Sequence, residues 1–341
     1  MKIAGTRFLV TGGTGFIGSA LVRALLARGA LVRSLDSDAR GRRSRLGDLQ
    51  RPGDDRLELL GGDIRDPATV LRAARGVTSV IHLAYVNGTE LFYSQPDLVL
   101  EVGVKGMMNV LDACLSTGIR DLVLASSSEV YQSPPVVPTD EHAPLSVPDV
   151  LNPRYSYGGG KIISELLAIN YGRRHFDRVA IFRPHNCYGP DMGEEHVIPQ
   201  LVRRLAERLA RADASGPAGA APAVVPLPIQ GTGEETRAFV YIDDLVEGVL
   251  RIVERGEHLG VYHVGTDEEV SVRELAVAIG ACLGVKVRPE AGPLQPGGTR
   301  RRCPSIAKLE ALGYAAKTPL AEGLRKTIPW YLENRAEGKP A

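Results

Sequence analysis

The sequence predicts an α/β fold, in which a doubly wound parallel sheet is followed by a smaller mixed α/β lobe. Two observations support this prediction. Across residues 7–182, short apolar segments of strand length alternate with segments of helical periodicity, as in strands joined by crossover helices. After Arg183 this alternation gives way to turn-forming residues and shorter elements. We therefore expect a first domain at 1–183, completed by segments that return from the C-terminal half, and a second lobe at 184–341.

Composition and charge are those of an ordinary globular protein. The chain has 341 residues, of which 44% are hydrophobic and 24% charged, and its length suggests roughly two domains. Lysine and arginine total 41 against 40 acidic residues, so the charge does not indicate nucleic acid as a partner. No apolar run approaches the length of a membrane span. The cysteines, Cys114, Cys187, Cys282 and Cys303, are far apart, which predicts reduced thiols in a cytoplasmic protein and no metal site.

The first strand, residues 7–10, leads into a glycine-rich turn. The turn reads Thr-Gly-Gly-Thr-Gly-Phe-Ile-Gly and precedes a helix expected at 19–28. Its glycines let backbone N–H groups approach a pyrophosphate at the positive end of that helix. A second strand is expected at 31–35 and is followed by Asp36, about 20 residues after the glycine turn. The Asp36 carboxylate would accept hydrogen bonds from a ribose. The cofactor-binding residues expected in this unit are Gly12, Gly15, Phe16, Ile17, Gly18 and Asp36.

The carboxylate of Asp36 also bears on which dinucleotide is bound. It would repel a 2′-phosphate, which favours NAD. Four nearby arginines, Arg33, Arg40, Arg42 and Arg43, leave NADP open.

Two further strands end in residues suited to the same ligand. The strand at 57–60 leads to Asp63 and Ile64, and the strand at 80–83 leads to Leu83 and Ala84. Because an open parallel sheet binds its ligand beyond the carboxyl ends of its strands, we expect Asp63 near the adenine and the small Ala84 beside the pyrophosphate. His82, inside the strand, is interpreted as a hydrogen-bonded core residue.

The segment 154–165 carries the chemistry. Tyr157 and Lys161 are four residues apart, so on a helix continuing to about residue 175 the ammonium would lie near the phenol and lower its pKa. Three glycines between them, each costing roughly 1 kcal/mol in a helix, predict that another group lies close to this backbone. The alternative is a loop after Pro153 with an ordinary lysine. A serine cluster at 126–128, after a strand at 121–125, could bond a sugar oxygen.

The remaining elements follow from periodicity and turn residues. We expect helices at 67–75, 98–117, 198–212, 244–254, 272–283 and 320–334, and strands at 178–182, 225–230 and 238–242. An Ala/Pro/Gly-rich tract at 214–226 predicts a loop or mobile flap.

These motifs occur in a fixed order that resembles the extended short-chain dehydrogenase/reductase family, in particular its NAD-dependent nucleotide-sugar epimerases, dehydratases and decarboxylases of the UDP-galactose 4-epimerase type. The order is the glycine turn with Asp36, the serine cluster, Tyr157 with Lys161, and an Arg-Pro-His-Asn-Cys-Tyr-Gly-Pro segment at 183–190. The likeness runs from about residue 6 to 331. It implies a Rossmann domain that binds NAD and a lobe that binds a nucleotide-diphosphate sugar.

The resemblance also implies roles for individual residues. Ser127, Tyr157 and Lys161 would form the catalytic triad, with Ser128 and Glu129 in the same turn. Pro184 would lie at the cofactor, together with Tyr157 and Lys161. The implied substrate-binding residues are Asn186, His196, Val197, Arg237 and Arg302.

The reaction implied most directly is epimerisation at C4 through a transient 4-keto sugar. In related 4,6-dehydratases an aspartate precedes the glutamate, and Ser128 stands there instead, which argues against dehydration. The UDP-glucuronate decarboxylases carry Ser-Glu at this turn and an arginine like Arg302, so decarboxylation remains an alternative. A non-catalytic NAD sensor is the alternative of another class, and the retained triad argues against it.

Two departures from the family pattern suggest extra space. The usual Asn-Val-x-Gly is here Gly-Val-Lys-Gly at 103–106, and the small residues between Tyr157 and Lys161 are all glycine. We expect room for a bulky or long-chain sugar. Relatives pair the helices at 98–117 and 157–175 across a two-fold axis, and apolar residues Val110, Leu111, Leu166 and Ile169 outside a single stripe predict a homodimer.

Overall fold

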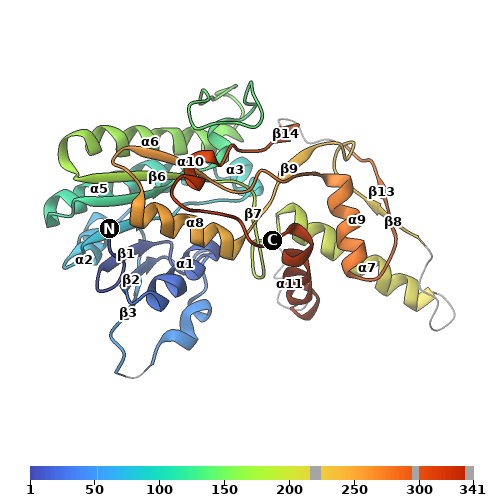
Figure 1. Ribbon diagram of the computed structural model, residues 1–341, viewed down its shortest axis with the longest axis horizontal. Coiled ribbons are helices and arrows are strands. Elements are labelled where there is room, and N and C mark those ends of the chain that lie inside the picture. Colours follow the sequence, from blue (N-terminus) through green and yellow to red (C-terminus); the bar gives the residue numbers. More distant parts are fainter. Residues whose placement is uncertain (52, 216–223, 294–298, 335–341) are drawn as a thin grey trace.

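The computed structural model describes residues 1–51, 53–215, 224–293 and 299–334. The strands of its main sheet are β1 (Arg7–Thr11), β2 (Leu31–Asp36), β3 (Leu57–Gly61), β4 (Ser79–His82), β5 (Asp121–Ala125), β6 (Arg178–Pro184) and β11 (Gly260–Val264). Along the sheet the order is β11-β6-β5-β4-β1-β2-β3. Figure 1 labels β1, β2, β3 and β6 among these strands. Every neighbouring pair is parallel. The predicted doubly wound sheet with a smaller second lobe is confirmed.

The connectivity places a ligand cleft at the centre of this sheet. β1 pairs with β2 on one side and with β4 on the other, so chain progression reverses between β1 and β4. The crossovers on either side of that point diverge, and a crevice opens beyond the carboxyl ends of the strands. The glycine turn and the segment after β4 both lie there.

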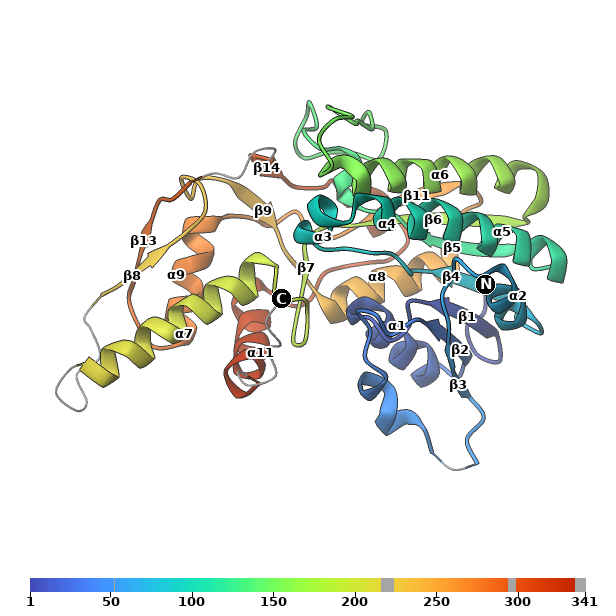
Figure 2. The ribbon, with the colours of Figure 1, turned by 180° about the vertical axis from the view of Figure 1, so that it is seen from behind.

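Helices cover both faces of the sheet, as Figure 2 shows. α1 (Phe16–Ala27) packs with α8 (Ile242–Arg255) on one face, and α2 (Pro67–Ala74), α5 (Gly106–Thr117) and α6 (Tyr155–His175) cover the other. Alternate residues of each strand feed these two layers. Phe8 and Val10 join the core beneath α1 and α8, whereas Leu9 joins the core beneath α5 and α6.

Local sequence sets several helix ends. Asp66 caps α2 by accepting hydrogen bonds from the backbone N–H groups of Ala68 and Thr69, and α5 ends at Gly118, which has a φ of 75°. The helix expected at 98–117 is continuous but irregular. It consists of α4 (Pro96–Leu100), a π-helical turn η2 (Glu101–Lys105) and α5.

Burial corrects part of the predicted dimer surface. Val110 and Leu111 are 1% and 0% exposed because they pack into the core beneath α5. Ile169 also packs against that core, and only Leu166 of the four residues named above is exposed, at 55%.

The smaller lobe is mixed, as predicted. Its elements are α7 (Val197–Ser215), β8 (Val225–Pro228), β9 (Thr236–Ala238), β12 (Glu269–Ser271), α9 (Val272–Cys282), β13 (Val287–Glu290), β14 (Arg301–Arg302) and α11 (Leu320–Glu333). β8 pairs with β13 in parallel, and β12 pairs with β9 antiparallel. The strand expected at 238–242 is instead divided between β9 and β10 (Val240–Tyr241). Most of the predicted flap at 214–226 lies outside the described residues.

The short elements complete the chain. They are η1 (Arg43–Leu49), α3 (Thr89–Ser94), η3 (Ser128–Val130), β7 (Cys187–Tyr188) and α10 (Ala307–Glu310). The four cysteines are free thiols. Within the described ranges, no helix is both long and apolar enough to cross a bilayer, and no three His, Cys, Asp or Glu side chains are grouped to hold a metal ion.

Candidate active site

A cavity of about 560 Å³ lies at the carboxyl ends of the strands, lined by residues from both halves of the chain. All of the predicted cofactor residues line it: Gly12, Gly15, Phe16, Ile17, Gly18, Asp36, Asp63, Ile64, Leu83, Ala84, Tyr157, Lys161 and Pro184. So do Ser127, Ser128, Glu129, Asn186, His196 and Arg302. The predicted substrate residues Val197 and Arg237 do not line the cavity.

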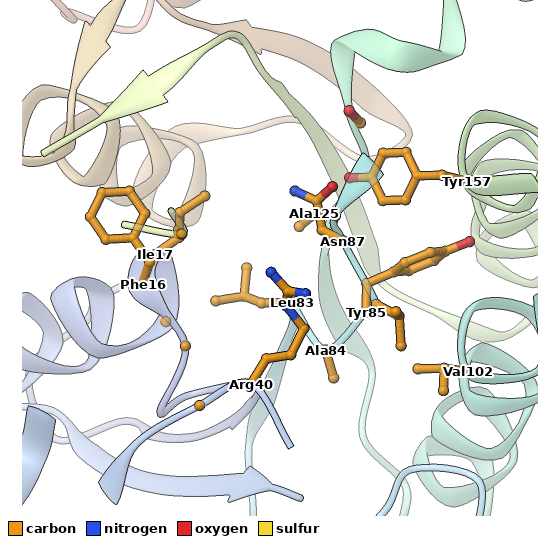
Figure 3. A pocket seen from close by; sticks show the side chains of 18 of the residues that line it. Phe16, Ile17, Arg40, Leu83, Ala84, Tyr85, Asn87, Val102, Ala125 and Tyr157 are labelled. Atoms are coloured by element: carbon orange, nitrogen blue, oxygen red, sulfur yellow. The ribbon is translucent and has the colours of Figure 1, made fainter. Parts of the chain in front are cut away.

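The glycine turn is shaped for a pyrophosphate. Gly12 has a φ of 74°, and a Cβ there would lie 2.8 Å from the Ala84 nitrogen; a Cβ on Gly18 would overlap the Gly12 carbonyl oxygen. α1 begins after Gly15 without a side-chain cap, so its first N–H groups are free to bind an anion. Figure 3 shows Phe16 and Ile17 facing Tyr157 across the cavity. A dinucleotide laid from this turn toward Tyr157 fits these residues.

Asp36 is held at the end of β2. Its two carboxylate oxygens accept hydrogen bonds from the backbone nitrogens of Thr14 and Asp38, each at 3.0 Å. The four arginines that left NADP open are paired with carboxylates: Arg33 with Glu58, Arg40 with Glu195, Arg42 with Asp191 and Arg43 with Asp38. A 2′-phosphate would have to compete with these pairs and with Asp36, so the site favours NAD.

Tyr157 lies in the first turns of α6, as predicted, and its hydroxyl points into the cavity (Figure 3). Its ring stacks on Phe92 at a centroid distance of 4.9 Å and meets Tyr85 edge-on at 5.2 Å. Burial raises the pKa of Tyr157 to about 12, although its hydrogen bond with Ser127 opposes the rise. The lowered pKa that the sequence predicted for Tyr157 is therefore wrong, because burial dominates.

The position of Lys161 explains that correction. Its Nζ donates a 2.7 Å hydrogen bond to the Ala125 carbonyl oxygen and lies 4.0 Å from the Tyr85 ring centroid, but 5.9 Å from that of Tyr157. Burial lowers the pKa of Lys161 to about 7, and Glu165 offsets part of this effect. Nζ is thus in closer contact with the Tyr85 ring than with the Tyr157 ring.

The glycines of α6 admit close neighbours, as predicted. A Cβ on Gly158 would lie 2.6 Å from Gln132 Nε2, and a Cβ on Gly160 would overlap the hydroxyl of Tyr85. A Cβ on Gly103 would overlap the same hydroxyl. The Tyr85 side chain occupies the space beside Gly103 and Gly160, and Gln132 lies beside Gly158, so the expectation of added room for a bulky sugar at these places is wrong.

Glu129 forms an ion pair across the two halves of the chain. Its Oε1 accepts a 2.7 Å hydrogen bond from Arg302. Burial would raise the pKa of Glu129, but Arg302, with help from Arg154 and Arg237, holds it below its ordinary range. The Nε of Arg154, which lines the cavity, is buried without a hydrogen-bond partner in the described part of the chain. Arg237, although outside the cavity lining, adds to this positive cluster.

The other predicted substrate residues differ in their surroundings. Asn186 has a φ of 36° and donates through Nδ2 to the Ala238 carbonyl oxygen at 3.0 Å. His196 lies against the cavity, and burial lowers its pKa. Val197 begins α7 beside it. The remaining catalytic candidates, Ser127 and Ser128, are buried at the end of β5.

A buried ion pair connects α6 to β6 next to the site. Arg183 bonds both carboxylate oxygens of Glu165 at 2.8 and 2.6 Å, with the two side chains 4% and 3% exposed. Ser126 also donates to Glu165. His82 is a core residue, as predicted, with its Nδ1 2.7 Å from Thr11 Oγ1.

Sequence reasoning missed three residues of the site: Tyr85, Phe92 and Arg154. Tyr85 could have been predicted to lie at the site from one observation, which is that it directly follows the cofactor-facing Ala84 at a strand end. Arg154 immediately precedes α6, and nothing in its sequence context distinguishes it from a solvated arginine.

Comparison with known proteins identifies relatives along the whole chain. A model of the NAD dependent epimerase/dehydratase family matches residues 8–265. The UDP-glucose 4-epimerase of Mycolicibacterium smegmatis is 32% identical over 328 residues, covering 95% of this chain and 98% of that protein. UDP-glucuronic acid decarboxylase 2 of Arabidopsis thaliana is 31% identical over 327 residues, covering 95% of this chain and 68% of that protein.

Among solved structures, a dTDP-glucose 4,6-dehydratase from Streptomyces venezuelae with NAD bound has a TM-score of 0.83 and 32% identity, covering 98% of this chain and 99% of that one. Relatives with three different activities therefore match this chain at nearly the same identity.

Proposed function

Because the chain belongs to the NAD-dependent epimerase/dehydratase family, we propose that it is a nucleotide-sugar epimerase that inverts C4 through a transient 4-keto sugar. The observation that carries this proposal is the Tyr157 hydroxyl, which points into the cavity opposite the glycine turn (Figure 3). It forms a hydrogen bond with Ser127, and Lys161 Nζ lies 5.9 Å from its ring centroid.

The residues of this chain would move the proton. Tyr157 removes the proton of the sugar C4 hydroxyl, and Ser127 bonds the same sugar oxygen. With a pKa of about 12 the phenol is protonated at rest. To act as a base the phenol must first release this proton to solvent, and a charged Lys161 would then stabilise the phenolate. NAD, held by the glycine turn and Asp36, would supply a hydride acceptor and donor for the sugar C4, with no net redox change over the cycle.

The ion pair of Glu129 argues against a dehydratase. Elimination of water needs an acid that protonates the departing hydroxyl. Arg302 keeps Glu129 ionised, and the neighbouring Ser128 is not an acid. Glu129 is therefore better suited to orienting the arginine than to donating a proton.

The positive cluster around Glu129 supports decarboxylation as a second candidate. Arg154, Arg237 and Arg302 all lower the pKa of the half-buried Glu129 carboxylate, and three arginines gathered in this way suit a diphosphate or a sugar carboxylate. We assign the diphosphate to Arg237 and Asn186, and the nucleotide base to His196 and Val197. Arg302 could bind either anion.

A panel of sugar nucleotides incubated with NAD separates these functions. Unchanged mass with an inverted C4 configuration, read by NMR, supports the epimerase. Loss of carbon dioxide would replace it with the decarboxylase, and loss of water with the dehydratase. Tyr157→Phe should abolish turnover, whereas Tyr171→Phe, near the far end of the same helix, should not. Equal behaviour of Tyr157→Phe and wild type toward every substrate would favour a non-catalytic NAD sensor.

We also propose that two copies associate through α5 and α6. Leu115, Ile163 and Leu166 are 39%, 40% and 55% exposed on these helices, and burying them between copies would add an apolar contact. Sedimentation should show a dimer that Leu166→Glu weakens. A wild-type species of 36.6 kDa at micromolar concentration would contradict the proposal.

A further inference from the structure

Tyr85 is an aromatic side chain of the site whose position calls for an explanation. Tyr85 follows β4 and the cofactor-facing Ala84, and it lines the cavity. Unlike Tyr157, it directs its hydroxyl away from the cavity, toward the helices that cover the sheet (Figure 3). That hydroxyl is buried and has no hydrogen-bond partner within the described residues. A buried hydroxyl without a partner is unfavourable, so another part of the side chain must justify its position.

The slot that receives Tyr85 is built from two glycines on two helices. Gly103 belongs to η2 and Gly160 to α6, and a Cβ at either would overlap the Tyr85 hydroxyl. Glycine inside a helix is unfavourable relative to alanine. The chain therefore carries two unfavourable helix residues that together fix the position of one ring.

That ring faces the ammonium of Lys161. Nζ lies 4.0 Å from the Tyr85 centroid, a distance at which the negative face of the ring attracts a cation. Nζ also donates a 2.7 Å hydrogen bond to the Ala125 carbonyl oxygen. The same ring also contacts Tyr157 edge-on, so Tyr85 touches both members of the pair.

We propose that Tyr85 is a positioning residue of the active site, whose ring face holds the Lys161 ammonium beside Tyr157 and whose position is set by Gly103 and Gly160. The proposal rests on the roles assigned above to Tyr157 and Lys161. In the reactive arrangement the phenol has lost its proton and the lysine is charged, so whatever stabilises the ammonium stabilises that arrangement.

The other titratable groups near Lys161 do not supply this effect. Burial and the nearby Lys161 charge lower the pKa of His82 to about 3, so it stays neutral in the neutral range. Glu165, one turn further along α6, attracts the ammonium, but it is already bonded by Arg183 and Ser126. Tyr157 presents its ring at 5.9 Å. Tyr85 is the aromatic face in closest contact with the ammonium.

The first test titrates Lys161 directly. In NAD-saturated protein with 13C-labelled lysine, assigned with Lys161→Met, Tyr85→Leu should lower the Lys161 titration midpoint by about one pH unit. Tyr85→Phe keeps the ring and should leave the midpoint unchanged. The matched control is Phe92→Leu, which removes a ring that stacks on Tyr157 but does not face Lys161, and it should also leave the midpoint unchanged.

Kinetics supply the second readout. Above neutral pH, a midpoint lowered by one pH unit reduces the fraction of enzyme with a charged Lys161 about tenfold. The kcat of Tyr85→Leu should therefore fall about tenfold, while its KM changes little. Gly103→Ala should act similarly, since its Cβ displaces the Tyr85 hydroxyl. Adding Gly103→Ala to Tyr85→Leu should lower kcat little further, because both changes disturb the same contact between Tyr85 and Lys161.

Three results would overturn the proposal. An unchanged Lys161 midpoint in folded Tyr85→Leu would show that the ring does not hold the ammonium. Equal effects of Tyr85→Phe and Tyr85→Leu would assign the role to the hydroxyl. If Tyr85→Leu does not fold, the NMR chemical shifts of the wild-type protein still test the proposal. Hε protons of Lys161 that show no upfield ring-current shift would place the amine away from the Tyr85 ring. The Lys161 titration midpoint is measured without a sugar substrate. If Tyr85→Leu shifts this midpoint but the wild type does not epimerise any sugar nucleotide, only the function proposed above is overturned.

Discussion

Replacing Lys161 by methionine should stabilise the protein while abolishing its activity. Burial lowers the pKa of Lys161 from 10.5 to about 7. These values differ by about 3.5 pH units, which at 1.36 kcal/mol each means that keeping the ammonium charged costs about 5 kcal/mol of folding free energy. Methionine fills a similar volume but leaves the Ala125 carbonyl oxygen without its donor, at about 1–3 kcal/mol. We expect Lys161→Met to gain about 2–4 kcal/mol at pH 6.

The gain should depend on pH in a defined direction. Below pH 7 the lysine is charged in both the folded and the unfolded chain, so burying the ammonium costs the full amount of about 5 kcal/mol. As the pH rises through 7 the folded protein loses the proton first, and the penalty shrinks until the unfolded lysine also titrates near 10.5. The advantage of Lys161→Met should therefore fall by about 3 kcal/mol between pH 6 and pH 9.

Urea unfolding at several pH values, with bound nucleotide removed from both proteins, measures this difference through the transition midpoint at constant slope. Lys326→Met is the matched control, because Lys326 is exposed and pairs with Glu322 on the surface. Its effect should not vary between pH 6 and pH 9. A pH-independent difference for Lys161→Met, or a wild type more stable at pH 6, would refute the reasoning.

Two further changes test the framework of the site. Glu165→Gln leaves the Arg183 charge without its buried partner and should cost about 3–5 kcal/mol of unfolding free energy in urea; a loss below 1 kcal/mol would show that the pair contributes little. Asp191→Asn removes the carboxylate that accepts a 2.6 Å hydrogen bond from Arg45, whose Nη1 bonds the Thr14 carbonyl oxygen in the glycine turn. The dissociation constant for NAD, measured by fluorescence titration, should rise about tenfold, in line with the loss of one charge-assisted hydrogen bond, and an unchanged constant would contradict this role.

Features set by neighbours in the chain were predicted well. The strand, glycine turn and helix at the N-terminus follow from apolar periodicity and from the φ that Gly12 adopts. The helix of Tyr157 and Lys161, the core role of His82 and the close approach to the α6 glycines were also confirmed. The strand at 238–242 was wrong because β10 ends where α8 begins, and a boundary between two adjoining elements leaves little trace in periodicity.

Features set by contacts between distant segments were predicted less well. Val110 and Leu111 were assigned to a dimer surface because their apolar character does not reveal which face of a helix another layer covers. The lowered Tyr157 pKa was expected from helical spacing alone, which carries no information on burial. The extra room was expected from missing side chains at 103 and 158–160, but side chains from other segments lie against Gly103, Gly158 and Gly160.

The sequence by itself determined the α/β class, the NAD-binding turn and the spacing of the tyrosine and lysine, because each depends on residues within a few turns of one another. Only the tertiary structure decided that Tyr85 lies against Lys161 and that Glu129 pairs with an arginine 173 residues away. It also decided that β11 is the returning segment that completes the first sheet. The physical reason is that burial and pairing of charges depend on which distant segments share a dry interior, and local periodicity does not encode that choice.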